Sequence, residues 1–412
     1  MEIQEILDSR FTEVVDPDVL AKARAFMIPR DLALSGTYPF FLEFEDAQDS
    51  TTRYQGRDII MLGSNNYLGL TTHPRVREAS AQAVTHWGTS FTGARTANGT
   101  HCLHSKLEER LASFLKKEAA LVFTTGYQAS VGILTSLVGT KDLAVLDKYA
   151  HASLADGARL AAGEMVRFGH NDVSELERVL SSWTGEGGTL VIVDGLYSMH
   201  GDLCNLPEVL SVCEQYNARL LVDDAHGIGV LGPGGSGTAA HFGVSARVDL
   251  IMGTFSKSLA SIGGFVAGPR AVIDYIRHTG RPFLFSASLP AACLAAADAA
   301  LSVLLDEPEL VSRVRANADY WWRGLSGLGL QVLGGGGAVV GILAGPEARA
   351  VTMWRELFDA GVYTNLALYP SVPREGAVLR TSVSANHTKV LLDRALDLVQ
   401  GVFEKHGWLP AR

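Results

Sequence analysis

Arg219-Leu-Leu-Val-Asp-Asp-Ala-His-Gly227 is an apolar run that ends abruptly in two carboxylates and an imidazole. Such a short, continuous apolar run predicts a strand that is buried on both faces, as in a parallel sheet covered by helices. Five other segments have the same character, and each precedes a helical pattern: residues 119–125, 143–147, 189–195, 249–257 and 263–268. This alternation predicts a doubly wound α/β domain.

The pattern changes on either side of this alternation. Residues 1–57 begin with an amphipathic helical stretch and continue with polar residues, so we expect an N-terminal helical or extended segment there. Residues 58–304 hold the predicted strands and helices and form the predicted large domain. Residues 305–412 combine longer helices with short alternating strands, which predicts a smaller α+β C-terminal domain.

The composition excludes several classes of protein. The 412 residues include 44 Asp and Glu against 35 Lys and Arg, without a basic run. We therefore expect no nucleic-acid surface and no surface for anionic membranes. Hydrophobic residues make up 47% of the chain, which indicates a large folded core. Four cysteines without a C-x-x-C pair favour a reducing, cytoplasmic location.

Membrane and metal signals are weak. The first twenty residues lack the layout of a signal peptide. The apolar stretch from Leu284 to Leu305 is interrupted by Pro290, so it predicts a buried helix and no transmembrane span. His101-Cys-Leu-His104 has no second cluster of ligands for zinc, so we predict no metal site.

A lysine follows one of the predicted strands. Gly253-Thr-Phe-Ser-Lys-Ser258 places Lys257 among small hydroxyl residues, directly after an apolar segment. A partly buried lysine has a lowered pKa and can act as an amine nucleophile toward an aldehyde. The neighbouring hydroxyl groups can bind a phosphate. A solvated surface charge explains this setting poorly.

Other strand ends carry polar residues that have simpler explanations when each is taken alone. Asp223 and His226 fit a strand-end turn, and His151 fits a structural histidine. Residues 124–128 fit an ordinary turn, although a helix start at Gly126 also forms an anion site. Ligands of open α/β sheets bind at the carboxyl ends of strands, which favours one shared site. An amine, a phosphate site, a carboxylate and a flat ring are the groups that pyridoxal phosphate (PLP) requires.

A glycine motif offers an alternative. Gly227-Ile-Gly-Val-Leu-Gly232 matches the G-x-G-x-x-G pattern of dinucleotide-binding folds, which would make the protein a nucleotide-dependent oxidoreductase. That fold requires a helix directly after the pattern, and Pro233-Gly-Gly-Ser-Gly237 cannot begin one. The pattern also lies outside the first strand–helix–strand unit. We therefore favour PLP over a dinucleotide.

From about Arg57 to His387 the chain resembles the α-oxoamine synthase family of fold-type I PLP enzymes. These enzymes condense an amino acid with an acyl thioester and release carbon dioxide. The motifs that carry the resemblance are Gly63-Ser-Asn-Asn-Tyr-Leu-Gly69, Ser90-Phe-Thr-Gly-Ala-Arg-Thr-Ala-Asn-Gly99, Thr125-Gly-Tyr127, His151-Ala-Ser153, Tyr197-Ser-Met199, Asp223-Asp-Ala-His226, Thr254-Phe-Ser-Lys257 and Leu379-Arg-Thr-Ser-Val-Ser-Ala-Asn-His-Thr388.

The resemblance implies an aspartate aminotransferase-like fold and a homodimer whose active sites lie at the subunit interface. The sequence at residues 253–258, 262–265 and 285–290 is most similar to the serine palmitoyltransferase branch. That branch implies L-serine and a palmitoyl-CoA-like donor as substrates, with a 3-ketosphinganine-type amino ketone as product. Alanine or glycine, and an acyl-carrier-protein thioester, remain alternatives. So does a non-catalytic partner subunit, against which the presence of Lys257 argues.

The family pattern also implies a role for each matching residue. Lys257 is the expected Schiff-base lysine and the base that removes the Cα proton. Asp223 is expected to pair with the pyridine nitrogen, His226 with the ring hydroxyl, and His151 to stack on the ring. These four are the predicted catalytic residues. The predicted cofactor-binding residues are Gly126, Tyr127, His151, Ser198, Asp223, His226, Thr254, Ser256, Lys257 and Ser286, the last reaching the phosphate from the partner subunit. The predicted substrate-binding residues are Arg380, for the carboxylate, and Asn66 and Tyr67, at the entrance.

Three positions depart from the family pattern. Asp194 replaces the usual glutamate before Tyr197-Ser-Met199, His200 stands where several relatives have Asp or an apolar residue, and Leu368 stands where some have Arg. The last change leaves Arg380 as the single candidate anchor for the substrate carboxylate.

Overall fold

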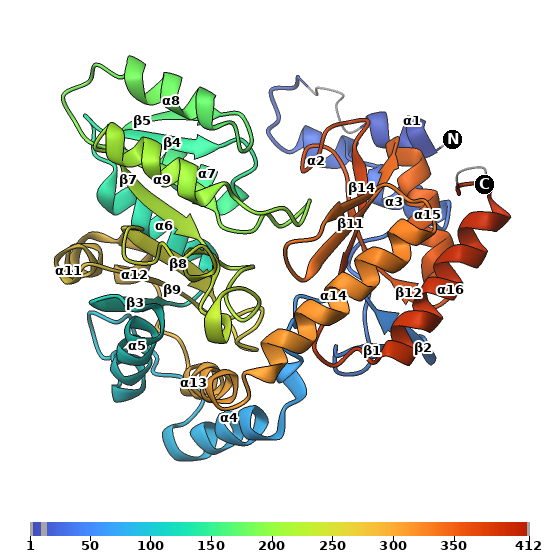
Figure 1. The fold of residues 1–412 in the computed structure, drawn as a ribbon, viewed down its shortest axis with the longest axis horizontal. Coiled ribbons are helices and arrows are strands. Elements are labelled where there is room, and N and C mark those ends of the chain that lie inside the picture. The colour runs from blue at the N-terminus through green and yellow to red at the C-terminus, as the bar shows by residue number, and fades with distance from the viewer. Residues whose placement is uncertain (1–2, 10–14, 410–412) are drawn as a thin grey trace.

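The computed structural model describes residues 3–9 and 15–409 of the chain. Its largest element is a seven-stranded sheet with helices packed on both faces (Figure 1). The strands, in spatial order, are β3 (Ala119–Phe123), β9 (Gly264–Gly268), β8 (Leu250–Thr254), β7 (Arg219–Asp223), β6 (Thr189–Asp194), β4 (Leu143–Asp147) and β5 (Glu164–Phe168). Two separate apolar cores cover the two faces, which explains why alternate residues of one strand are equally apolar.

All six predicted strands form, and the sheet is mostly parallel, as expected. One strand departs from this direction, because β9 runs antiparallel to both β3 and β8. An apolar run reports burial on two faces and says nothing about direction. The sequence pattern did not identify β5, whose residues are mostly exposed and which pairs only with β4.

Helices connect the strands and cover the sheet. They are α4 (Pro74–Trp87), α5 (Cys102–Leu115), α6 (Gly126–Leu137), α7 (Ala152–Leu160), α8 (Val173–Ser182), α9 (Leu206–Gln215), α10 (Thr238–His241), α11 (Arg270–Thr279), α12 (Arg281–Leu284) and α13 (Ala291–Asp306). The predicted helix from Leu284 to Leu305 is wrong at its start, because α12 ends at Leu284 and α13 begins only at Ala291, after the N-cap residue Pro290. Among the described helices, none combines the length and hydropathy that crossing a membrane requires.

The C-terminal part is built on an antiparallel sheet of β10 (Val332–Gly334), β11 (Val339–Gly345), β14 (Ala377–Ser382) and β13 (Asn365–Ala367). Its helices are α14 (Glu309–Gly327), α15 (Glu347–Asp359) and α16 (Lys389–Lys405). The N-terminal helices are α1 (Ile3–Asp8), α2 (Ala21–Ala25) and α3 (Ile28–Leu34). Apolar residues of α1 and α3 share one core with the C-terminal part (Figure 1).

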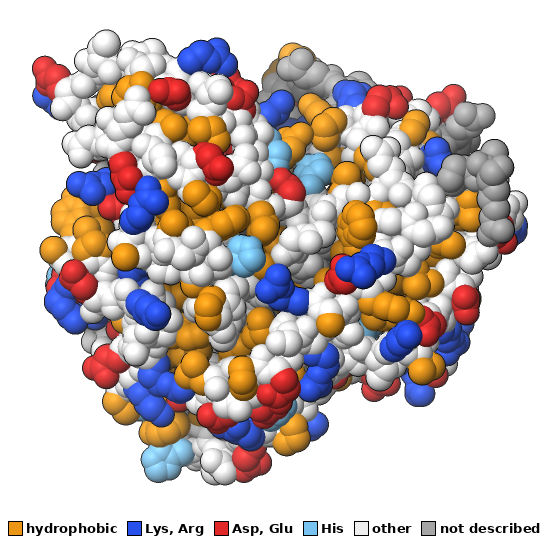
Figure 2. All heavy atoms as spheres, in the orientation of Figure 1, with side chains coloured by type: hydrophobic (Ala, Val, Ile, Leu, Met, Phe, Trp, Pro, Cys, Tyr) orange, Lys and Arg blue, Asp and Glu red, His pale blue; other side chains and the backbone are white. Residues whose placement is uncertain are grey.

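A third small sheet joins the two ends of the chain. Strands β1 (Thr51–Tyr54) and β2 (Arg57–Met61) form a hairpin, and β2 pairs in parallel with β12 (Val362–Tyr363). The hairpin spans the predicted boundary at residue 57, and that division of the chain into domains stays a prediction. On the face shown in Figure 2, acidic and basic side chains are mixed over the surface.

A buried ion pair ties α5 to the sheet. The Arg95 Nη1 atom lies 3.0 Å from Glu108 Oε1, and their side chains are 4% and 7% exposed. The same carboxylate oxygen accepts the Val122 N–H of β3 at 3.1 Å. Arg277 Nη2 lies 3.6 Å from the other oxygen, Oε2. The buried Glu108 carboxylate therefore pairs with the buried guanidinium of Arg95, lies near that of the partly exposed Arg277 and accepts one strand amide.

Glu108→Gln should lower the free energy of unfolding by about 3 kcal/mol, because it leaves a buried guanidinium without its counter-charge. Asp319→Asn is the matched control, since it breaks an exposed pair with Arg323 on α14. That change should cost less than about 0.5 kcal/mol. Chemical denaturation of both variants measures the difference, and equal losses would contradict the argument.

Candidate active site

A cavity of about 330 Å³ lies at the carboxyl ends of the central strands. Asp194 and Asp223 are the last residues of β6 and β7 and are register partners, and Lys257 follows β8. Parallel strands bring these ends to one edge of the sheet. Eight of the ten predicted cofactor-binding residues line the cavity: Gly126, Tyr127, His151, Asp223, His226, Thr254, Ser256 and Lys257.

One wall of the cavity has the properties of a phosphate site. Thr125 caps α6 by accepting the Gln128 N–H at 3.1 Å, so the N–H groups of the first helical turn face the cavity end. The hydroxyl groups of Thr254 and Ser256 lie 2.8 Å apart beside this turn. A Cβ on Gly126 would lie 3.1 Å from Thr254 Cβ, so glycine keeps this wall open to an anion.

Lys257 is partly buried beside two carboxylates. Burial lowers the pKa of Lys257 to about 8, although the charges of Asp223 and Asp194 favour its protonated form. The amine is therefore largely protonated at neutral pH but has a deprotonated fraction far above that of a free lysine. This state suits both Schiff-base formation and proton transfer.

The two neighbouring aspartates of the quoted strand do different work. Asp223 lines the cavity, and its Oδ1 accepts the Ala225 N–H at 3.0 Å. Asp224 points away and accepts from both the N–H and the hydroxyl of Thr238, at 2.7 and 2.6 Å. Asp224 therefore holds a turn, and only Asp223 is available to a ligand.

Asp194 also lines the cavity and was not among the predicted site residues. Its Oδ1 accepts the His151 N–H at 3.1 Å. Burial, and next the charge of Asp223, raises the pKa of Asp194 well above its usual range. Its position at a strand end, before the Tyr197-Ser-Met199 motif, was the signal that could have identified it. Asp194 fixes the backbone from which the His151 ring projects.

The His151 ring lies at the cavity mouth. It caps α7, since its Nδ1 accepts the Ser153 N–H at 3.3 Å and lies 2.8 Å from the Ser153 hydroxyl. The backbone N–H of His151 is thus held by Asp194 and its ring by Ser153, which fixes a flat ring on one side of the cavity. This arrangement can support a stacked aromatic ligand.

His226 forms the inner end of a polar chain that links the two sheets. Its Nδ1 lies 2.6 Å from the Tyr67 hydroxyl. Arg380, on β14, donates from Nη2 to Tyr67 at 3.4 Å and to Asn65 Oδ1 at 3.0 Å. Tyr67 is completely buried, inside the protein and away from the entrance where it was expected. Burial, then the charges of Lys257 and Arg380, lowers the pKa of His226 well below its usual range.

The remaining predicted residues lie around the cavity without lining it. The Arg380 Nε donates to the Ser198 carbonyl oxygen, and the Arg380 charge acts on both Lys257 and His226 of the cavity. Ser286 accepts from Gln128 Nε2 at 3.0 Å, near the start of α6. Asn66 donates to Thr71 Oγ1 at 2.7 Å and lines an adjoining cavity of about 730 Å³. The roles predicted for these residues stay predictions.

The loop at Gly227–Gly232 does not form a dinucleotide site. A short turn of 3-10 helix follows it at Pro233–Gly235, in place of the long helix that the motif requires. A Cβ on Gly227 would lie 2.0 Å from Asp224 Oδ1, so this glycine accommodates a protein carboxylate. In the described part of the chain, no three His, Cys, Asp or Glu side chains form a cluster that could hold a metal.

The chain is similar to known proteins in both sequence and fold. Residues 57–399 match the model of the aminotransferase class I and II family. The chain is 40% identical to a serine palmitoyltransferase of Sphingobacterium spiritivorum, over 92% of this chain and 95% of the relative. It is 40% identical to 8-amino-7-oxononanoate synthase 1 of Bacillus velezensis, over 88% and 93%. The solved serine palmitoyltransferase of S. paucimobilis, with a bound PLP-myriocin adduct, has a TM-score of 0.92 at 34% identity and covers 95% of this chain and 99% of its own.

The chain belongs to the α-oxoamine synthase family. It is a PLP-dependent acyltransferase with the fold-type I architecture. The α-oxoamine synthase cavity fits PLP by the chemistry of its groups: a lysine amine, a carboxylate at the end of β7, a fixed flat ring and a helix start with two hydroxyls.

The predicted phosphate site, formed by the start of α6 with Thr254 and Ser256, can be tested at Gly264, which does not line the cavity. A Cβ on Gly264 would lie 2.6 Å from Gly126 Cα, so Gly264→Ala must displace the first turn of α6. We expect about tenfold weaker PLP binding to the apoenzyme, because such overpacking costs on the order of 1–3 kcal/mol. Gly188→Ala is the control, since its Cβ would meet its nearest neighbour at 3.7 Å. Absorbance titration with PLP measures both, and unchanged affinity in Gly264→Ala would refute this role of the close contact.

The state of Lys257 can be tested by its reactivity. In the apoenzyme, reductive methylation followed by peptide mass mapping should reach half its maximal rate near pH 8 at this residue. A free lysine peptide in the same tube should do so at about pH 10.4. Asp223→Asn removes a charge that favours the protonated amine, so it should move the midpoint to lower pH. A midpoint at the value of the free peptide would contradict the buried setting of the amine.

Proposed function

We propose that this enzyme condenses L-serine with a long-chain acyl-CoA such as palmitoyl-CoA. The products are carbon dioxide and a 3-ketosphinganine-type amino ketone. Relatives at 40% and 42% identity and neighbours at TM-scores of 0.92 carry the name serine palmitoyltransferase, which supports this choice of substrates. Bound PLP supplies an electron sink for charge that develops at the amino-acid Cα.

One observation carries the two-substrate proposal. Lys257 lines both the cofactor cavity and the adjoining cavity of about 730 Å³. The second cavity is bordered mainly by neutral polar residues such as Gln48, Asn66 and Thr72. Amide and hydroxyl groups of this kind suit the uncharged, amide-rich arm of a thioester carrier. The amine of Lys257 therefore stands where the amino acid and the acyl donor meet.

Residues of the chain itself move the proton, hold the cofactor and bind the amino acid. Lys257 takes the proton from Cα, for which an amine with a pKa of about 8 is well matched to neutral pH. The carboxylate of Asp223 keeps the cofactor's pyridine nitrogen protonated, and His151 packs on its ring. His226 lines the cavity, and because its Nδ1 is held by Tyr67, its other ring nitrogen is left for the ring hydroxyl of the cofactor. Arg380 binds the amino-acid carboxylate, close to the Tyr67 hydroxyl that it already contacts.

We also propose a homodimer with shared active sites. Large apolar side chains around the cavity mouth are exposed in the single chain, with Tyr127 at 51%, Ile262 at 49% and Phe285 at 74%. Such a group beside a site favours coverage by a second copy. In that dimer, Ser286 approaches the phosphate of the neighbouring site.

A second candidate uses alanine or glycine, or an acyl-carrier-protein donor. It is favoured by the relatives named 8-amino-7-oxononanoate synthase, which are as similar to this chain as the serine palmitoyltransferases are. Both candidates share the cofactor, the lysine and the decarboxylative condensation. They differ in the side chain at Cα and in the thioester.

A substrate panel separates the candidates. Serine, alanine and glycine are each combined with acyl-CoA donors of increasing length and with an acyl-carrier-protein thioester. We expect the fastest thiol release with serine and palmitoyl-CoA, and a product mass equal to that of 3-ketosphinganine. Lys257→Ala should lower the rate about a thousandfold or more, because it removes both the amine and the base. A larger yield with alanine or glycine would overturn the serine assignment.

A further inference from the structure

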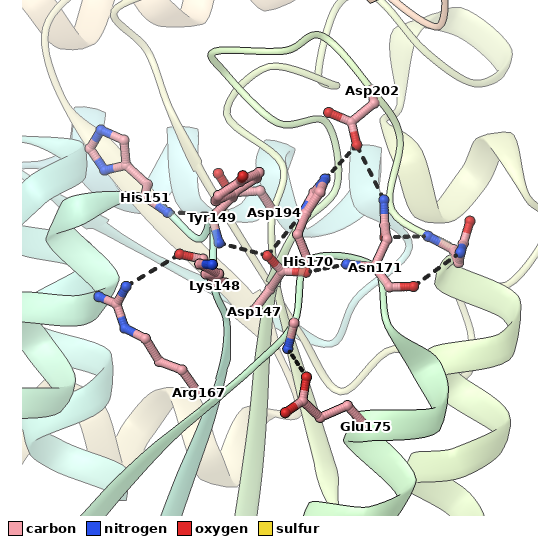
Figure 3. Close-up of polar contacts among 12 residues, drawn as sticks. Asp147, Lys148, Tyr149, His151, Arg167, His170, Asn171, Glu175, Asp194 and Asp202 are labelled. Atoms are coloured by element: carbon pink, nitrogen blue, oxygen red, sulfur yellow. Dashed lines mark hydrogen bonds and ion pairs between the residues drawn. The ribbon is translucent and has the colours of Figure 1, made fainter. Parts of the chain in front are cut away.

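A polar network outside the cavity has no role in the function proposed so far. Figure 3 shows His170 between two carboxylates, at the edge of the sheet where β4 and β5 end. Its Nδ1 lies 3.0 Å from Asp147 Oδ1, and its Nε2 lies 2.7 Å from Asp202 Oδ2. Asp147 is 1% exposed and ends β4. A histidine with a carboxylate on each ring nitrogen donates at both ends.

This histidine is therefore an imidazolium. Burial by itself would lower the pKa of His170, but the hydrogen bonds and charges of Asp147 and Asp202 outweigh it and raise the pKa to about 9. The other titratable groups facing it are His200, whose ring centroid lies 6.4 Å away, and the tyrosines on its two sides. Burial lowers the pKa of His200; the charge of Asp202 opposes this shift and the charge of His170 adds to it, and the net direction is downward, which favours a neutral imidazole.

The Asp147 end of the network belongs to the segment that carries His151. The Asp147 carboxylate also accepts the Tyr149 N–H at 2.7 Å and the Asn171 N–H at 2.9 Å. The ring of Tyr149 packs on His170, with centroids 4.5 Å apart. In Figure 3 the His151 ring points away from this network, toward the opposite side of the segment.

The Asp202 end belongs to a turn of the loop 196–203, which a bridge between Leu196 and Leu203 closes. Within it, the Tyr197 N–H donates to the Asp202 carbonyl at 2.9 Å. The next residue, Ser198, offers the carbonyl oxygen that accepts from Arg380 Nε. The loop also carries His200, which is stacked on Tyr149 at 5.0 Å. Asp202 is thus the carboxylate by which this loop reaches His170.

We propose that His170 is a positioning residue of the condensation: its charged ring joins Asp202 to Asp147 and holds the loop 196–203 so that the Ser198 carbonyl aims Arg380. The argument rests on the proposed role of Arg380 as the amino-acid carboxylate anchor. Asn171 supports the same contact, because its Nδ2 donates to Asp202 Oδ2 at 3.2 Å and to the Leu203 carbonyl at 2.9 Å. His170 touches neither substrate nor cofactor, so its effect passes through the loop.

Two test variants each remove one partner of the contact between His170 and Asp202, and a third variant is the control. His170→Gln removes the charge, and Asp202→Asn removes the partner of the ring on the loop. Glu175→Gln is the control, because Glu175 accepts the Gly169 N–H at 2.7 Å in the same turn but does not contact the loop 196–203. All three are prepared as the PLP-loaded enzyme, and PLP content and thermal midpoint are measured for each. Asp202→Asn keeps the test open if His170→Gln fails to fold.

The first readout does not depend on the identity of the substrates. Hydrogen–deuterium exchange of peptides covering the loop 196–203 should be faster in His170→Gln and Asp202→Asn than in the wild type, and unchanged in Glu175→Gln. Unchanged exchange in both test variants would overturn the proposal, because the loop would then be held by other contacts. If serine proves not to be a substrate, that result contradicts the proposed function, but it does not affect the exchange measurement.

The second readout tests the effect on Arg380. We expect KM for the amino acid, and its dissociation constant from the change in the cofactor's visible absorbance, to rise about tenfold in both test variants. KM for the acyl-CoA and kcat should change less than about threefold, because those steps do not use the carboxylate anchor. If the loop 196–203 exchanges hydrogen faster but the affinity for the amino acid is unchanged, His170 stabilises the loop without positioning Arg380, and the proposal is overturned.

A pH series adds a signature that simple destabilisation does not produce. The raised pKa means that the charged link is complete below about pH 6.5 and is lost as the pH rises through about 9. The ratio of dissociation constants between His170→Gln and the wild type should therefore shrink above about pH 9, where the wild type has also lost the charge. A ratio that stays constant from pH 7 to pH 10 would count against the imidazolium as the acting group.

Discussion

The attraction between the Lys257 amine and the carboxylates of Asp223 and Asp194 is the interaction on which the rest of the site depends. In a buried cavity an amine alone would lose its proton, and two carboxylates alone would repel each other. In this group the pKa of Lys257 is lowered only to about 8, and the pKa of Asp194 is raised well above its usual range. Parallel strand direction makes this possible, because it brings the ends of β6, β7 and β8 to one edge.

Close backbone approach is the second condition. Gly264, on β9, allows the first turn of α6 to lie directly against the sheet, and Gly126 leaves that turn open. The antiparallel direction of β9 brings its first residue to the same edge as the last residue of β8, since Gly264 pairs with Thr254. The strand that departs from the parallel pattern is therefore the one that completes the phosphate wall.

Local patterns in the sequence predicted the six apolar strands, the helix start at Gly126 and the grouping of Lys257 with Asp223, because burial and strand ends are visible in neighbouring residues. They did not predict β5, whose exposed residues carry little apolar signal, or the direction of β9. The burial of Tyr67 and the contact between β2 and β12 depend on segments some 160 and 300 positions apart, which local patterns cannot report. The contacts of His170 with Asp147 and Asp202 span 23 and 32 positions, which is also more than a local pattern covers.

These long-range contacts explain how two sheets serve one reaction. Arg380 belongs to the antiparallel C-terminal sheet, while His226 and Lys257 follow strands of the central sheet. Tyr67 bridges them, since its hydroxyl contacts both the arginine and the histidine. A movement of one sheet against the other would therefore change the proposed carboxylate anchor, Arg380, and the proposed cofactor contact, His226, together. If Arg380 has its proposed role, catalysis requires the two sheets to keep this relative position, and the buried Tyr67 is a side chain that contacts residues of both parts.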